Sequence, residues 1–428
     1  MMRRRMFCVI ILEVLLIYSS IPKSGAFGLG NAPPGLFHAD IAQLLKRRNS
    51  FSQGSNDNNG CGIHPLKGNT AVVTGAAGGI GGEIAKIIHR LGGTVVALDR
   101  DVAGLEKLKD TLDDEERSRE GLISNESRVW VLPTQHQDLD SVSHSANQII
   151  DRFDRIDFLV NNAGLTYRDD FICGDERMKA TNGQDLLFTV NYLSHFLLTE
   201  KLLPNLSRAK GRVVHLTSTY HWKVDGSEII PGDAKCPQAY EFDPSSQSTK
   251  HIERSYGNSK LAQIFHSRSI HMHAPDCDSV CACPTWAATG IGGEDARDFL
   301  SMMAFPIEGS NEGETATTKI EEIRYGPGIT SAINAMFRPR EELGDALNCG
   351  RSFVANSRTL EFFVFRNSLL RWPIWRDGLT DLLGFLLLLG QRITYEDFII
   401  QETSPESQDE EKRSQLYNWS RKEVQEWL

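Results

Sequence analysis

A glycine-rich stretch that begins at residue 75 limits the possible folds of this chain more than any other sequence feature. The run from Ala71 to Thr74 predicts a buried strand, and apolar residues recur at helical spacing from Ile84 to Leu91. Five glycines within eight residues separate the two patterns: Gly75, Gly78, Gly79, Gly81 and Gly82. In such a context, glycines let the backbone approach a pyrophosphate at the N-terminus of a helix. The stretch predicts a dinucleotide-binding turn, and the alternative is a tight loop without a ligand.

Strand and helix patterns alternate along the chain from Lys67 onward. Further strand-like runs lie at residues 94–99, 129–132, 158–160, 212–216 and 279–283, and helical patterns lie at 102–116, 141–153, 183–203 and 254–273. Residues 351–355 are a candidate last edge strand. Repeated strand–helix–strand units imply a parallel sheet covered on both faces. We therefore expect an α/β fold, a Rossmann-type doubly wound parallel sheet of about seven strands, with a C-terminal apolar and helical extension.

Charge and cysteine content exclude several classes of protein. The formal net charge is -10, and no basic stretch beyond Lys46–Arg48 stands out, so we expect no nucleic-acid partner. Eight cysteines in 428 residues do not form a disulfide scaffold. Cys277, Cys281 and Cys283 lack a fourth zinc ligand at a usual spacing. We interpret them as buried thiols and expect no metal site.

The N-terminal region has the features of a targeting sequence. Three arginines at 3–5, an apolar segment at 7–18 and small residues at 24–26 predict a signal peptide over residues 1–26, with an uncleaved signal anchor as the alternative. Phe27 after the candidate cleavage site resembles the bipartite presequences of algae with secondary plastids. Residues 27–66 then suit a transit peptide or a disordered secretory linker. We expect entry into the secretory pathway, with a secondary plastid or the endoplasmic reticulum as destination.

Tyr256 and Lys260 form a candidate acid/base pair. They lie four residues apart on a predicted helix and so share one face. A free tyrosine has a pKa of about 10, and a nearby ammonium lowers it, which allows proton exchange with an alcohol or carbonyl. Two strand ends carry further polar groups: Ser218 follows the fifth strand, and Asn161-Asn-Ala-Gly164 follows the fourth. Without these neighbours, the pair would be a chance helical spacing.

Together these motifs resemble the short-chain dehydrogenase/reductase family over residues 67–356. The matching residues are Thr74-Gly-x-x-x-Gly-x-Gly81, Asp138, Asn161-Asn-Ala-Gly164, Asn191, Ser218, Tyr256-x-x-x-Lys260 and Pro284. Two longer segments, 190–199 and 256–265, look most like the retinol-dehydrogenase-like branch.

The resemblance implies a catalytic tetrad and a nicotinamide coenzyme. Tyr256 would be the acid/base, Lys260 would lower its pKa and hold the nicotinamide ribose, and Ser218 would polarise the substrate oxygen. Asn191 would position a water that links Lys260 to solvent. Asp138 would contact the adenine and Asn161 the adenosine side. The implied cofactor-binding set is Thr74, Gly75, Gly79, Ile80, Gly81, Asp99, Arg100, Asp138, Asn161, Ala163, Gly164, Tyr256, Lys260, Pro284 and Thr289.

The choice between NAD and NADP depends on the end of the second strand. Asp99 lies there, where a carboxylate accepts hydrogen bonds from a ribose 2′-hydroxyl and repels a 2′-phosphate. Arg100 and Arg90 could attract that phosphate instead, and Arg100 lies where this branch often has its phosphate-binding arginine. We expect NAD in preference to NADP.

The region after the sixth strand departs from the family pattern. The family usually has Pro-Gly there, whereas this chain has Pro284-Thr285-Trp286, so the loop at the nicotinamide is expected to differ in shape. Residues 285–345 are interpreted as a substrate lid and 357–428 as a C-terminal extension. The apolar part of the extension, between residues 360 and 389, is expected to pack on the protein; a homodimer face and peripheral membrane contact are the alternatives.

The leading hypothesis is an NAD(P)-dependent oxidoreductase that acts on an apolar alcohol, ketone or aldehyde. One alternative is a plastid pigment reductase of the same family, and another is an NAD(P)-binding or sensing protein without turnover. Substrate identity, reaction direction and oligomeric state do not follow from the sequence.

Overall fold

The computed structural model describes residues 65–120, 127–166, 179–230, 250–284, 287, 329–344, 351–355 and 398–428. The chain divides into two units, residues 1–38 and 39–428, and every described residue belongs to the second. The predicted signal segment lies outside the described residues, as do residues 27–64 of the predicted transit segment, most of the predicted lid, the apolar stretch at 360–389 and Thr289. The account below concerns the second unit alone.

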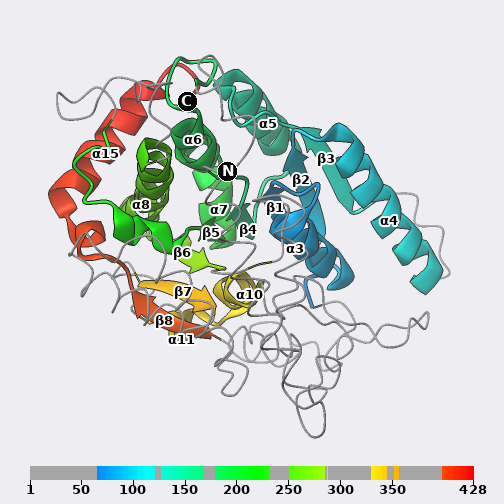
Figure 1. Ribbon diagram of the computed structural model, residues 1–428. Helices are drawn as coiled ribbons and strands as arrows, with labels where there is room; N and C mark the ends of the chain where they lie inside the picture. The colour runs from blue at the N-terminus through cyan, green and yellow to red at the C-terminus, as the bar shows by residue number, and fades with distance from the viewer. Residues whose placement is uncertain are drawn as a thin grey trace, which may run out of the picture. The chain divides into compact units, whose positions relative to one another are not determined.

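An eight-stranded sheet forms the centre of this unit, in the order β3-β2-β1-β4-β5-β6-β7-β8 (Figure 1). Strands β1 to β7 are parallel, and β8 pairs antiparallel with β7. The strands are β1 (Thr70–Thr74), β2 (Thr94–Asp99), β3 (Val129–Pro133), β4 (Phe158–Asn161), β5 (Arg212–Leu216), β6 (Asp278–Cys283), β7 (Arg351–Ala355) and β8 (Phe398–Glu402). The doubly wound parallel sheet of seven strands is thus confirmed. The prediction that residues 351–355 form the edge is wrong, because β8 covers that edge.

Neighbouring residues of one strand enter different cores, as the two-residue period of a strand requires. Ala71 and Val73 pack in one apolar cluster, and Val72 between them packs in the other. The first cluster is covered by α3 (Gly79–Arg90), α4 (Val102–Glu120) and α10 (Thr330–Phe337), and the second by α5 (Leu139–Arg152), α7 (Ser194–Ala209) and α8 (Lys250–His273). Both faces of the sheet are therefore buried, which explains the continuous apolar runs of its strands.

The long helix predicted at residues 183–203 is not one regular helix. It begins with α6 (Leu186–Phe188), continues as a π-helical turn, η2 (Thr189–Leu193), and becomes α7. The amide of Ser194 reaches back five residues to the carbonyl of Thr189. Asn191 lies within this turn and is fully buried. Insertions of this kind re-aim side chains and are frequent at functional sites.

Part of the C-terminal extension is integral to the fold. The helix α15 (Glu410–Glu423) packs on α8 and buries Leu416 (Figure 1). Its Arg421 donates to Glu200 of α7 at 2.7 Å, and the hydroxyl of Tyr192 lies 2.7 Å from Ser420 Oγ. The extension thus covers the helices that follow β4 and β5.

Residues 329–343, which the sequence analysis placed at the end of a lid, form a buried layer. All eight residues of α10 are buried, and the helix packs against β5, β6 and β7. The short α11 (Arg340–Leu343) follows it. The guanidinium of Arg212 at the start of β5 donates to three carbonyl oxygens of this region, at 2.7–3.1 Å. These bonds hold α10 against the sheet.

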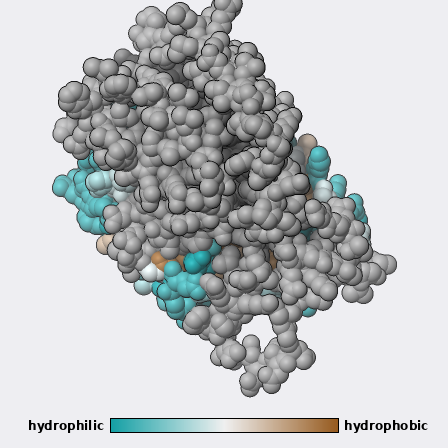
Figure 2. All heavy atoms as spheres, turned by 60° about the horizontal axis from the view of Figure 1, so that its bottom comes forward, coloured by the Kyte–Doolittle hydropathy of each residue, from teal (hydrophilic) through white to brown (hydrophobic). Residues whose placement is uncertain are grey.

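Few large apolar side chains are exposed on the described surface. They are Val102, Met272 and Leu428. On the face shown in Figure 2, most of the described surface in view is hydrophilic. Among the described helices, none combines the length and hydrophobicity needed to cross a bilayer.

Candidate active site

The glycine-rich turn lies where the strand order changes direction, between β1 and β4. Gly75 has φ +67° and Gly79 has φ +56°, backbone conformations that favour glycine. A Cβ on Gly81 would lie 2.3 Å from the carbonyl oxygen of Gly75, so no side chain fits there. Ile80, in the first turn of α3, packs on the first core. The predicted turn thus needs glycine for two reasons, backbone angle and close packing.

The N-terminus of α3 is open. Its N-cap is Gly78, no side chain caps the helix, and its first turn contains no acidic residue. A Cβ built on Gly78 would meet nothing within 4 Å. The first amides of a helix and its dipole attract anionic groups. The turn therefore offers space and positive potential at the same place.

The hydroxyl of Thr74 joins the ends of β1 and β4. It accepts hydrogen bonds from the main-chain amides of Asn162 and Ala163, both at 2.9 Å. It also lies 2.9 Å from His195 Nε2 and 3.2 Å from the carbonyl oxygen of Val160. Thr74 is fully buried. Thr74, which was predicted to lie at the coenzyme turn, is therefore a buried residue that connects the turn to the β4 loop.

Two neighbouring asparagines at the end of β4 have opposite roles. Asn161 is fully buried, and its amide nitrogen donates to Thr199 Oγ1 at 3.0 Å, away from the turn. Asn162 Nδ2 instead donates to the carbonyl oxygens of Thr74 at 2.8 Å and Gly75 at 3.3 Å. The adenosine contact predicted for Asn161 could come only from its main chain. Sequence reasoning did not single out Asn162, although its place in Asn161-Asn-Ala-Gly164 was a signal.

Asp99 at the end of β2 contacts the turn directly. Its Oδ2 accepts from the amide of Ala77, and its Oδ1 accepts from the amide of Asp101, both at 3.0 Å. Arg100, next to it, is exposed. Asp138 is the N-cap of α5 and accepts from the amide of Asp140 at 3.1 Å. The structure thus places Asp99, Arg100 and Asp138 at or after the carboxyl ends of β2 and β3.

Asn191 joins three parts of the site. Its Oδ1 accepts from the amide of Leu165 at 2.8 Å, and its Nδ2 donates to the carbonyl of Leu165 at 3.0 Å and to Ser259 Oγ at 3.1 Å. A Cβ on Gly164 would lie 3.2 Å from Asn191 Oδ1, which accounts for glycine there. The side chain therefore binds the β4 loop and α8 at the same time.

Tyr256 and Lys260 lie side by side on α8. The ammonium nitrogen of Lys260 is 5.5 Å from the ring centroid of Tyr256. Lys260 is 5% exposed and donates to the carbonyl of Leu216 at 2.8 Å. Burial lowers the pKa of Lys260 from 10.5 to about 8. The Tyr256 ring is half-buried and packs against an apolar cluster formed by Leu165, Ala180, Leu186, Leu187 and Val190.

Ser218 approaches this pair from the end of β5. It is the N-cap of a 3₁₀ helix, η3 (Thr219–Lys223), and its Oγ accepts from the amide of Tyr220 at 3.4 Å. The Tyr220 and Tyr256 rings meet edge to face, with centroids 5.3 Å apart. A Cβ on Gly257 would lie 3.0 Å from the carbonyl of Tyr220, so glycine allows η3 to pack closely on α8. The segment that carries Ser218 therefore lies directly beside Tyr256.

The end of β6 completes the site as far as it is described. Pro284 is half-buried there, and Thr289 lies outside the described residues. Cys277, Cys281 and Cys283 are buried, as the sequence analysis interpreted them. Burial raises the pKa of Cys277 and of Cys281 to about 12, so both are held as thiols.

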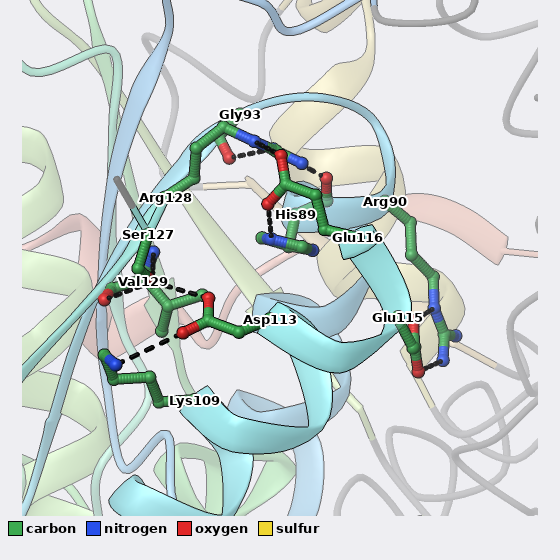
Figure 3. A network of polar contacts seen from close by, with 10 residues as sticks. All are labelled: His89, Arg90, Gly93, Lys109, Asp113, Glu115, Glu116, Ser127, Arg128 and Val129. Carbon is green, nitrogen blue, oxygen red and sulfur yellow. Dashed lines mark hydrogen bonds and ion pairs between the residues drawn. The ribbon is translucent and has the colours of Figure 1, made fainter. Parts of the chain in front are cut away.

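A second polar cluster lies away from the tetrad, between α3, α4 and the start of β3 (Figure 3). His89 Nε2 lies 3.1 Å from Glu116, which also accepts from Arg128 at 2.8 Å. Asp113 accepts from Ser127 at 2.6 Å and pairs with Lys109 at 3.2 Å. Ligand atoms of His89, Asp113 and Glu116 lie within 4.8 Å of one another. Because these carboxylates already have cationic partners, we interpret the cluster as a clamp between the elements.

The fold and this arrangement define a doubly wound α/β protein with a dinucleotide-type turn, and comparisons with known proteins agree. The short chain dehydrogenase family model matches residues 69–225. An uncharacterized oxidoreductase of Schizosaccharomyces pombe is 31% identical over 49% of this chain and 56% of its own length. Human retinol dehydrogenase 13 is 33% identical over 48% of this chain and 54% of its own length. The chain thus spans about half the length of the curated relatives it matches.

A solved structure supports the fold alone. The crystal structure of an uncharacterized protein from Mycobacterium paratuberculosis covers 84% of this chain and 94% of its own, with 18% identity and a TM-score of 0.50. Residues 69–225 thus resemble the short-chain dehydrogenase/reductase family, and retinol dehydrogenases are among the proteins to which this chain is similar.

Proposed function

We propose that this protein is an NAD(P)-dependent oxidoreductase that transfers a hydride between a nicotinamide coenzyme and an apolar alcohol, ketone or aldehyde. The observation that carries the proposal is the meeting of Tyr256 and Lys260 on one face of α8. Ser218 approaches them on η3, and Asn191 is bonded to Ser259 of the same helix. The four residues come from three segments, η2, η3 and α8, which follow the carboxyl ends of strands, where α/β proteins bind ligands.

The described residues fit a nicotinamide dinucleotide. The open N-terminus of α3, the positive φ angles of Gly75 and Gly79 and the missing side chain at Gly81 suit a pyrophosphate. The carboxylate of Asp99 beside the turn suits a ribose hydroxyl. A bound nicotinamide would supply or accept the hydride.

The chain's own residues would then move one proton and hold the substrate. Tyr256 acts as the acid/base toward the substrate oxygen, and Ser218 donates a hydrogen bond to the same oxygen. Lys260 places a positive charge beside the phenol ring at neutral pH, which favours loss of the phenol proton. Asn191 keeps α8 in register with the β4 loop through Ser259 and Leu165.

Two observations support an apolar substrate. The ring of Tyr256 packs against an apolar cluster. Retinol dehydrogenase 13, a relative, is named for an apolar alcohol.

For the coenzyme, the position of Asp99 supports NAD, because a 2′-phosphate beside its carboxylate would be repelled. Replacing Asp99 by alanine should shift the NAD/NADP affinity ratio toward NADP.

The proposed function is tested with the full chain and its Tyr256→Phe variant. Melting temperatures are measured with NAD, NADP, NADH and NADPH, since a ligand of the native state raises them. Turnover is then measured in the dark on a panel of aliphatic and isoprenoid alcohols and aldehydes. We expect coenzyme binding by both proteins and turnover by the wild type alone. Coenzyme binding without any turnover would favour a sensing protein, and no binding would refute the proposal.

Targeting and assembly are part of the proposal. The composition of residues 1–66 supports entry into the secretory pathway. Few large apolar side chains are exposed among the described residues, so we propose residues 360–389 as the segment for any membrane contact or homodimer face. Fusing residues 1–66 to a fluorescent protein tests the first point, because cytosolic fluorescence would exclude it. Light scattering of the purified chain, with and without vesicles, tests the second.

A further inference from the structure

From the hydrogen bonds of His195 we infer that this side chain is a positioning residue, which transmits the geometry of the coenzyme turn to Asn191. The inference rests on the proposed function and deepens it. His195 lies on α7, one turn after Asn191, and is 1% exposed. Its Nε2 lies 2.9 Å from Thr74 Oγ1, and its Nδ1 lies 3.0 Å from the carbonyl oxygen of Asn191.

The partners determine where the protons lie. The Asn191 carbonyl can only accept, so Nδ1 carries the proton. Burial holds the pKa of His195 well below 6.5, and His136, whose ring centroid is 4.8 Å away, adds to the effect. The ring is therefore neutral and Nε2 is an acceptor, which receives the hydroxyl proton of Thr74.

This assignment uses the whole bonding capacity of Thr74. Its single proton goes to His195 at 2.9 Å, since the alternative acceptor, the Val160 carbonyl, is farther away at 3.2 Å. Its two lone pairs accept from the amides of Asn162 and Ala163. The chain of bonds thus has one direction, from the β4 loop through Thr74 and His195 to the carbonyl of Asn191.

A second donor reaches the same carbonyl from α8. Gln263, one turn after Lys260 and 1% exposed, donates through Nε2 to the Asn191 oxygen at 2.7 Å. His195 and Gln263 therefore donate to the same carbonyl oxygen, which has two lone pairs. Asn191 is therefore bound from α7 and α8 through its main chain, and from the β4 loop and α8 through its side chain.

The competing interpretation is a core histidine that only stabilises the fold. Both interpretations predict a lower melting temperature for His195→Leu. The positioning role also predicts weaker coenzyme binding, which a side chain with one donor and one acceptor restores. Glutamine has both groups and leucine has neither, so His195→Gln is the rescue variant. His89→Leu is the matched control, because His89 is equally buried but lies in the clamp away from the tetrad.

The experiment measures the dissociation constants of NADH and NADPH by calorimetry for the full chain and these variants. We expect His195→Leu to bind about tenfold more weakly, and His195→Gln to lie within about threefold of the wild type. His89→Leu should bind like the wild type although it melts earlier. Thr74→Val should bind at least as weakly as His195→Leu, and the double variant should lose less affinity than the product of the two single losses, because both substitutions remove the bond between Thr74 and His195.

Three results would overturn the inference alone: wild-type affinity in His195→Leu, no rescue by glutamine, or effects of Thr74→Val and His195→Leu that multiply. If His195→Leu does not fold, Thr74→Ser and Thr74→Val test the same bond from its other end. Thr74→Ser, which keeps the hydroxyl, should then bind coenzyme more tightly than Thr74→Val, and equal affinity of the two variants would refute the inference. A wild-type chain that binds neither coenzyme would refute the proposed function and the inference together.

Discussion

The side chain of Asn162 donates a hydrogen bond to the carbonyl oxygen of Thr74 at 2.8 Å, and so joins the end of β4 to the first residue before the glycine-rich turn. The same nitrogen lies 2.8 Å from the position of a Cβ on Gly75 and 2.5 Å from one on Gly81. One amide therefore supports the turn and also explains two of its glycines. The stability of this turn depends on a residue from the middle of the sheet.

Replacing Asn162 by alanine should damage the turn. The carbonyl oxygens of Thr74 and Gly75 lose a donor, and an unsatisfied buried polar group costs about 1–3 kcal/mol. We expect the free energy of unfolding to fall by that amount and coenzyme affinity to fall about tenfold. Urea unfolding and calorimetry measure the two quantities. Asn147→Ala, an exposed change on α5, is the control, and equal behaviour of both variants would contradict the role of Asn162.

Gly81→Ala and Gly78→Ala form a matched pair of substitutions within one turn. A Cβ at position 81 would overlap the Gly75 carbonyl oxygen, whereas one at position 78 meets nothing within 4 Å. Because Gly78 has φ −175°, which any residue adopts, its variant should lose no more than about 1 kcal/mol of stability. Gly81→Ala should lose about 2 kcal/mol or more through strain of the backbone. Equal stabilities in urea would show that the turn can relax around a methyl group.

The pH dependence of turnover should show the ionisation of Lys260. Its pKa is lowered to about 8 by burial, so the ammonium is present below that pH and is lost above it. We expect kcat/KM of the wild type to fall as the pH rises through about 8. Lys260→Arg, which stays charged, should have low activity without a fall in that range. A wild-type profile that is flat from pH 7 to 9.5 would contradict a requirement for the ammonium.

The buried histidines should make the fold sensitive to mild acid. Burial lowers the pKa of His136 from 6.5 to about 4, and that of His89 and His221 to about 4 as well. Between pH 6.5 and 4 the unfolded chain binds more protons than the folded one, so stability present above pH 6.5 is lost as the pH falls.

Urea unfolding at pH 7.5 and pH 5 measures this loss. We expect each such histidine to contribute about 1–2 kcal/mol of it. His136→Gln should therefore lose less stability than the wild type over this range. His144→Gln, which changes an exposed histidine, should lose as much as the wild type. An identical loss of stability for His136→Gln and the wild type would show that His136 binds protons equally in the folded and the unfolded state over this pH range.

Much of the site was predictable because its motifs are local. The residues of the turn, Tyr256 with Lys260, and Ser218 each follow from spacing within one strand or helix. The structure places the turn and Ser218 at strand ends and Tyr256 with Lys260 on α8. The roles of His195 and Gln263 were not predictable, because each depends on a contact between α7, α8 and β1. No short-range pattern shows which polar residues share one buried carbonyl.

By itself, the sequence determined the alternation of strands and helices, the parallel sheet and the position of the glycine turn, because side-chain periodicity and backbone freedom act over a few residues. Only the tertiary structure decided that Asn162 instead of Asn161 faces the turn, that residues 189–193 form a π-helical turn, and that β8 and α15 complete the fold. These features depend on strand register and on packing between distant segments. Their free energy comes from contacts that exist only once the sheet has assembled.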